Sequence, residues 1–216
     1  MKKLKVYIAD DHTLFRKAMA SMIGTFKEVD VVKDAENGKE LLTLVRHEAP
    51  DIAIVDLQMP IMDGAETCEQ MLEKYPEVKL IVLTMHDSEK YILHMMEMGV
   101  HAFLMKNTEP EELEIAILSV VEKDFYHNDL VASVLRKNMK LKTVSERPVF
   151  GTQNLTERET EILKLVCFEL TMKEIAERLS ISENTTRNHR ANIMEKLGVK
   201  NTVGLIKYAY ETGMLK

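Results

Sequence analysis

Five short apolar runs alternate with longer segments of helical periodicity in the first half of the chain. The runs span residues 4–9, 29–35, 51–57, 78–84 and 101–105, and helical patterns cover residues 13–26, 38–48, 64–74, 87–98 and 109–123. Nearly continuous apolar strands that alternate with helices are typical of a parallel sheet with helices on both faces. We therefore predict an α/β domain over residues 1–125, with a doubly wound five-stranded parallel sheet.

The second half shows helical patterns only. Residues 126–150 read as a polar linker with a short helix near 128–139, and Pro148 and Gly151 act as breakers. Residues 151–216 then predict four helices. The first two begin with capping boxes, and the third runs from Ser182 to Gly198 after the short link "SIS". This spacing predicts a small all-α four-helix domain with a helix-turn-helix.

Composition excludes several classes of protein. No run of about 18 apolar residues is present, and the N-terminus becomes acidic too early for a signal peptide, so we expect a cytoplasmic protein without a membrane partner. The cysteines and histidines lack metal-ligand spacing. The net charge of −6 is uneven, because acids predominate in residues 1–125 and bases after them. This asymmetry indicates two domains with different partners.

Polar side chains follow four of the predicted strands, at the carboxyl ends where ligands bind in such sheets. They are Asp10, Asp11, Asp56, Thr84 and Lys106. Converging carboxylates need a cation, and oxygen ligands favour Mg²⁺. A divalent ion, an ammonium and a hydroxyl around one carboxylate would stabilise a transferred phosphoryl group. Asp56 lies between the acidic pair Asp10 and Asp11 on one side and Thr84 and Lys106 on the other. It is therefore the candidate nucleophile.

These residues carry a family resemblance. "ADD" at 9–11, "DLQMPIMDG" at 56–64, "LT" at 83–84 and "FLMK" at 103–106 together resemble the flavodoxin-like receiver domain of two-component response regulators. The resemblance implies that Asp56 accepts phosphate from a sensor histidine kinase. It also implies that Asp11, Asp56 and the Gln58 backbone carbonyl hold Mg²⁺, with Asp10 acting through water, and that Thr84 and Phe103 form a switch pair with an inward-turning ring.

Two further positions border the phosphoryl site in receivers. Gln58 and His86 lie two residues beyond Asp56 and Thr84, and we expect them to set the lifetime of the phosphoryl group. Asn107 departs from the family, in which proline often follows the lysine. A cis bond before residue 107 is therefore disfavoured by about 2.5–4 kcal/mol.

The third predicted helix of the second half carries DNA-binding chemistry. Arg and Asn side chains can bond guanine and adenine edges, and Lys can neutralise phosphates. The run from "LTERETEILKLV" to "NHRANIMEKLGV" resembles the LuxR-type helix-turn-helix of NarL/FixJ response regulators over residues 153–213. The resemblance implies base contacts from Arg187 and Asn188. Backbone contacts are expected from the residues Lys173, Thr185, Arg190 and Lys196.

Three departures from the helix-turn-helix pattern stand out. Glu169 replaces the usual turn glycine, Thr186 replaces a usual valine, and Ala191 stands where some relatives carry a base-contacting lysine. The glycine replacement would strain or reshape the turn. The operator of those relatives cannot be transferred to this chain.

The sequence thus predicts a transcription factor, not an enzyme, that forms a homodimer when phosphorylated and binds a two-part site on double-stranded DNA. Two alternatives remain. One is a phosphohydrolase that turns over an aspartyl phosphate, and the other is a phosphate-independent DNA-binding regulator whose first domain serves only for dimerisation.

Overall fold

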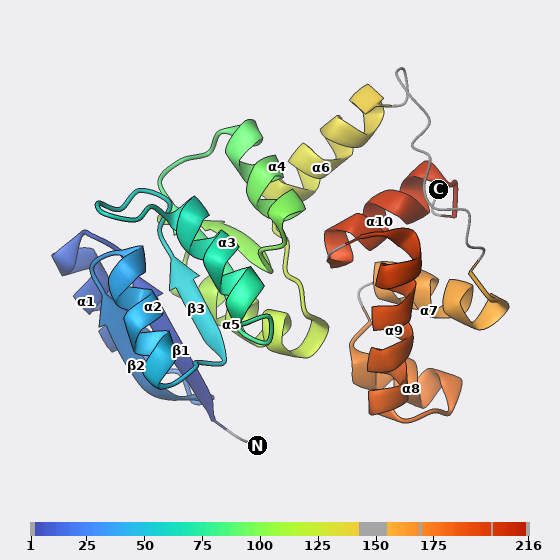
Figure 1. Ribbon diagram of the computed structural model, residues 1–216, viewed down its shortest axis with the longest axis horizontal. Helices are drawn as coiled ribbons and strands as arrows, with labels where there is room; N and C mark the ends of the chain where they lie inside the picture. The colour runs from blue at the N-terminus through green and yellow to red at the C-terminus, as the bar shows by residue number, and fades with distance from the viewer. Residues whose placement is uncertain (1–2, 143–154, 169, 200, 215–216) are drawn as a thin grey trace. The chain divides into compact units, whose positions relative to one another are not determined.

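The computed structural model describes residues 3–142, 155–168, 170–199 and 201–214 (Figure 1). The chain divides into two compact units, Met1–Asn128 and Asp129–Lys216. In the described residues, no helix is both long and apolar enough to cross a membrane.

The first unit is built on a five-stranded parallel sheet. Its strands are β1 (Leu4–Ala9), β2 (Val29–Ala35), β3 (Ile52–Val55), β4 (Lys79–Thr84) and β5 (Ala102–Met105). The strand order is β2-β1-β3-β4-β5, and every pairing is parallel. The order reverses between β1 and β3, so a crevice opens at their carboxyl ends. The predicted doubly wound sheet is confirmed.

Helices cover both faces of this sheet (Figure 1). On one face α1 (Thr13–Ile23) and α5 (Pro110–Lys123) pack on Ile8, Ile54 and Ile81. The residues between these in each strand point to the other face, where α2 (Gly38–His47), α3 (Gly64–Lys74) and α4 (Glu89–Met98) lie. Both faces are therefore buried, which explains the nearly continuous apolar strands.

An ion-pair cluster joins the end of α2 to the first two strands. Glu48 accepts hydrogen bonds from Lys33 Nζ at 2.8 Å and Lys5 Nζ at 2.6 Å, and Lys33 Nζ lies 5.1 Å from the centre of the Tyr7 ring. The hydrogen bonds from Lys33 and Lys5 lower the pKa of Glu48 to about 2, and the Glu48 contact raises the pKa of Lys33 to about 12.

We expect the Glu48 carboxyl to titrate near pH 2 in the folded protein. The NMR chemical shift of this carboxyl group measures the titration. Because the folded pKa is depressed, the contribution of Glu48 to stability is complete above its unfolded pKa of about 4.3 and disappears as the pH falls toward 2. In Lys33→Met the midpoint should move back up toward the unfolded value. A wild-type titration midpoint near pH 4 would show that, in solution, the two lysines do not stabilise the charged form of Glu48.

The second unit contains five helices in its described part. They are α6 (Asp129–Lys142), α7 (Glu157–Cys167), α8 (Met172–Leu179), α9 (Glu183–Leu197) and α10 (Thr202–Glu211). Helices α7 to α10 share a core that includes Ile162, Ile175, Ile193 and Leu205. Both predicted capping boxes are present, Ser182 caps α9, and Gly198 ends it with φ of 64°. The predicted four-helix arrangement is confirmed.

The predicted linker contains a helix. Its expected short helix is α6, which extends to Lys142 and buries Val131, Val134 and Leu135. These three residues recur at helical spacing and form one apolar face. Helix α6 falls within the second compact unit, which begins at Asp129. The predicted domain bounds of 1–125, 126–150 and 151–216 stay a prediction. The turn residue Glu169 lies outside the described residues, so its effect stays a prediction.

Candidate functional site

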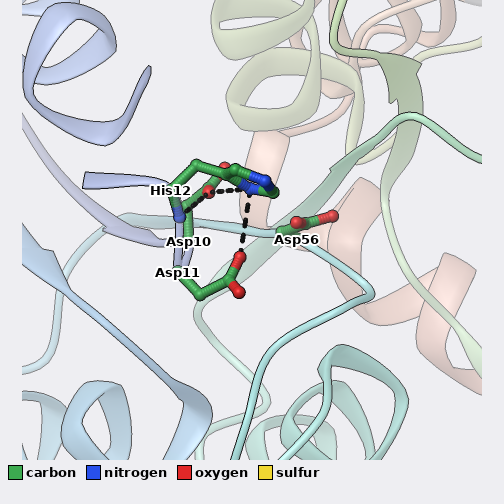
Figure 2. A group of neighbouring side chains, drawn as sticks. All are labelled: Asp10, Asp11, His12 and Asp56. Carbon is green, nitrogen blue, oxygen red and sulfur yellow. Dashed lines mark hydrogen bonds and ion pairs between the residues drawn. The ribbon is translucent and has the colours of Figure 1, made fainter. Parts of the chain in front are cut away.

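Three aspartates converge at the carboxyl ends of β1 and β3 (Figure 2). Asp10 and Asp56 are only 1% and 4% exposed, whereas the Asp11 side chain is 38% exposed. One ligand atom from each of Asp10, Asp11, His12 and Asp56 lies within 4.8 Å of the others. The sheet brings them together because β1 pairs directly with β3, and Asp56 N donates to Ala9 O at 2.9 Å. This oxygen-rich set could hold a divalent cation.

Lys106 enters the same site from the end of β5. Its Nζ lies 2.7 Å from Asp56 Oδ2 and 2.8 Å from Asp10 Oδ2, and its backbone N–H donates to Thr84 O at 2.9 Å. Burial works to lower the pKa of Lys106, but the hydrogen bonds to Asp10 and Asp56 outweigh it and leave this pKa raised. The ammonium therefore stays charged and offsets the two buried carboxylates.

The expected switch pair lies in the sheet beside this cluster. Thr84 ends β4 and is fully buried, with its Oγ1 accepting from His86 N at 3.3 Å. Phe103 lies in the neighbouring strand β5 opposite Val82, and its ring is fully buried. The switch role that the resemblance implies for this pair stays a prediction.

Gln58 and His86 face a cavity next to the carboxylates. The cavity has a volume of about 470 Å³, and Asp11, Gln58, His86 and Tyr91 contribute to its lining. The rings of His86 and Tyr91 lie 6.4 Å apart. Both residues expected to set phosphoryl lifetime therefore border open space beside the site, where a water molecule could approach.

Two residues in contact with the site were missed by the sequence reasoning. The His12 Nδ1 lies 3.1 Å from Asp11 Oδ1 and 3.4 Å from Asp10 Oδ1 (Figure 2). Arg16, 2% exposed, donates to the Asp10 backbone carbonyl and to the carboxylates of Asp34 at 2.8 Å and Glu36 at 2.9 Å. The position of His12 directly after "DD" was an available signal, but nothing in the helical pattern of α1 indicates the partners of Arg16.

The loop after Asp56 passes close to its own strand. Gly64 N donates to Leu57 O at 2.9 Å, and a Cβ at Gly64 would lie 2.1 Å from the Asp56 carbonyl oxygen. Only glycine allows this approach, which leads the chain from Asp56 into α3.

Helices α8 and α9 place part of the expected DNA-binding set on the surface. Lys173, Arg187 and Asn188 are exposed, and Arg187 pairs with Glu183 one turn earlier at 2.6 Å. Thr185 is half-buried and its Oγ1 lies 2.7 Å from Ser182 Oγ. Their roles in DNA binding stay predictions.

Arg190 and Lys196 both form contacts within the domain. The Arg190 side chain is only 8% exposed and donates to Thr202 Oγ1 at 2.8 Å, because residue 190 shares the inward stripe of Thr186 and Ile193. Lys196 Nζ lies 2.6 Å from Glu159 Oε1 and joins α9 to the start of α7. The Arg190 side chain is thus buried and Lys196 is paired within the domain, and the DNA backbone contacts expected of both residues stay predictions.

Comparisons with known proteins agree with this architecture. Residues 6–118 match the response regulator receiver domain, and residues 153–209 match the bacterial regulatory proteins of the luxR family. The chain is 32% identical over 219 residues to the oxygen regulatory protein NreC of Staphylococcus epidermidis, covering 99% of this chain and 100% of NreC. It is 30% identical over 226 residues to the transcriptional regulatory protein DegU of Brevibacillus brevis, covering 99% and 96%.

Among solved structures, the RcsB response regulator of Salmonella typhimurium aligns with a TM-score of 0.58 and 25% identity, covering 97% of this chain and 99% of RcsB. These relatives are regulatory proteins rather than enzymes, in agreement with the sequence-based expectation. The chain belongs to the two-component response regulators that join a receiver domain to a LuxR-type DNA-binding domain.

Proposed function

We propose that this protein controls transcription by binding DNA in a form that phosphorylation of Asp56 favours. The observation that carries the proposal is the buried Asp56 carboxylate, held 2.7 Å from the Lys106 ammonium and grouped with Asp10 and Asp11. Such a grouping supports phosphoryl transfer through positioning and electrostatic stabilisation. A regulator of this kind works where the DNA is, so the proposal includes a cytoplasmic location.

The phosphoryl donor in this proposal is a phosphohistidine of a sensor histidine kinase. An oxygen of Asp56 forms a bond to phosphorus while the bond from phosphorus to the imidazole nitrogen breaks. Lys106 is already within hydrogen-bond distance of this carboxylate and can neutralise an oxygen of the incoming group. Gln58 and His86 line the adjacent cavity, which supports a role for them in controlling how water reaches the phosphoryl group.

The donor set of this site fits Mg²⁺. All three carboxylates offer hard oxygen ligands, and their ligand atoms lie within 4.8 Å of one another. Asp11, Asp56 and the backbone carbonyl of Gln58 would hold the ion, and Asp10 would act through water. When bound, Mg²⁺ neutralises negative charge on the transferred phosphoryl group.

Control of DNA binding follows from a two-state receiver. The Thr84 hydroxyl moves onto the phosphoryl group. Phe103 lies on the neighbouring strand β5, two residues before the partner of Thr84, and it responds through the packing on their shared face of the sheet. The phosphorylated form pairs two chains, because one small helix-turn-helix makes few phosphate contacts and a dimer binds two half-sites together.

The test uses the full chain and a random duplex DNA pool, with and without acetyl phosphate and Mg²⁺. We expect phosphorylation to raise the retained DNA by about tenfold in the wild type, within the usual range of coupling between sites. Asp56→Asn should show no increase. Asp30→Asn, an equal loss of charge at an exposed position in β2, should behave like the wild type.

Other outcomes separate the alternatives. Equal DNA retention by wild type and Asp56→Asn under both conditions would refute phosphate control and favour a phosphate-independent regulator. Steady release of phosphate from a simple phosphate ester, lost in Asp56→Asn, would instead support the phosphohydrolase.

A further inference from the structure

Helix α9 presents a face that is rich in asparagine. Asn184, Asn188 and Asn192 are all exposed and recur every four residues. Four residues advance a helix by about 6 Å and rotate it only about 40°, so the three side chains form one slanted row. The exposed residues of this face are Glu183, Asn184, Arg187, Asn188, Ala191, Asn192 and Glu195.

The three amides have no hydrogen-bond partner in the described part of the chain. Among the residues that the structure describes, none forms a hydrogen bond with the side chain of Asn184, Asn188 or Asn192. By contrast, Arg187 on the same face is paired with Glu183 at 2.6 Å. The row of amides is therefore an accessible set of hydrogen-bonding groups on the helix.

The charge of this face argues against simple attraction to phosphates. Glu183 and Glu195 outnumber the single guanidinium of Arg187 among its exposed residues. Binding through phosphates needs an excess of positive charge, and such contacts carry no sequence information. If this face enters the major groove, its contribution has to come from contacts with the base edges, while other residues such as Lys173 contact phosphates.

Asparagine is suited to one base in particular. Its side-chain amide donates and accepts at once, which matches the N7 acceptor and N6 donor of adenine in the major groove. Ala191 lies between Asn188 and Asn192 and offers a methyl group that can contact the thymine methyl. Because base pairs are about 3.4 Å apart along the duplex, amides about 6 Å apart would meet bases roughly two steps apart.

We infer that Asn184, Asn188 and Asn192 form an asparagine ladder that reads adenines in an A·T-rich half-site through the major groove. The inference rests on the proposed DNA-binding function and adds the base composition of the site. Asn188 was expected to contact a base from the family resemblance, whereas Asn184 and Asn192 acquire a role only from their alignment with it on the exposed face.

The experiment selects binding sites from a random duplex pool with the phosphorylated full chain, in the presence of acetyl phosphate and Mg²⁺. Wild type should enrich a half-site with A·T pairs at three separated positions. Each of Asn184→Ala, Asn188→Ala and Asn192→Ala should lose its preference at one position, a different one for each variant, by about tenfold. Alanine favours a helix more than asparagine, so the variants should remain folded, as circular dichroism can check.

Lys173→Ala serves as the matched control, since Lys173 is exposed on the neighbouring helix α8. It should weaken binding to all sequences alike and leave the enriched motif unchanged, as expected for a phosphate contact. An unchanged motif in all three asparagine variants, or a G·C-rich half-site in the wild type, would overturn the ladder while DNA binding stands. Failure of the wild type to retain any DNA would overturn the proposed function itself.

Discussion

Replacing Gly64 by alanine should destabilise the receiver by about 3 kcal/mol or more and prevent phosphorylation of Asp56. The added Cβ would lie 2.1 Å from the Asp56 carbonyl oxygen and 2.7 Å from the Leu57 Cα, so it meets backbone rather than a flexible side chain. Relief requires the loop to move away from β3, which displaces the Asp56 carboxylate from Lys106 and from the other aspartates. Urea unfolding and mass spectrometry after treatment with acetyl phosphate measure the two effects.

Gly24→Ala is the matched control for this change. A Cβ at Gly24 would come no closer than 3.2 Å to another heavy atom, and Gly24 has an ordinary helical φ of −61°. We expect Gly24→Ala to alter stability by much less and to accept phosphate normally. If Gly64→Ala unfolded at the wild-type urea concentration and accepted phosphate at the wild-type rate, the close approach of the loop to β3 would be wrong.

Replacing Arg16 by methionine should cost about 3–5 kcal/mol of stability, the usual effect of removing one partner from a buried ion pair. Arg16 is 2% exposed and holds Asp34, Glu36 and the carbonyl of Asp10 at once. Burial alone would raise the pKa of Asp34, but hydrogen bonds from Lys17 and Arg16 outweigh it and lower this pKa. Without Arg16, Asp34 keeps its burial and loses a compensating charge.

The matched control for Arg16→Met is Lys17→Met. Lys17 contacts the same Asp34 at 2.9 Å, but its side chain is 62% exposed, so its loss should cost at most about 1 kcal/mol. Because Arg16 also supports the carbonyl of Asp10, Arg16→Met should weaken Mg²⁺ binding in a fluorescence or calorimetric titration, whereas Lys17→Met should not. Equal unfolding midpoints for both variants would show that burial of Arg16 carries no special cost.

Local pattern determined most of the fold in advance. Strand and helix positions in the first 125 residues follow from apolar runs and helical periodicity, and the capping boxes at Thr156 and Thr171 mark helix starts that the structure confirms. The aspartates could be assigned to one site because parallel strands bring their carboxyl ends to a common edge. These features depend on neighbours in sequence or on a single rule of topology.

Other features depended on contacts between distant segments. The buried position of Arg190 requires α10 to supply Thr202, and the burial of Val131 on α6 likewise depends on contacts with other elements. Sequence periodicity places a residue on a face of a helix, but it does not say whether that face is covered. A charged residue such as Arg190 therefore looked exposed until its neighbours were known.

The sequence by itself determined the sheet, the two kinds of domain and the grouping of the three aspartates at one edge of the sheet. Only the tertiary structure decided that Arg16 supports this site, that Gly64 must have no side chain, and that α9 exposes three aligned asparagines. The physical reason is that burial and close backbone approach are properties of packed elements. They arise when segments far apart in the chain meet, whereas strands, helices and caps are already encoded in short stretches of residues.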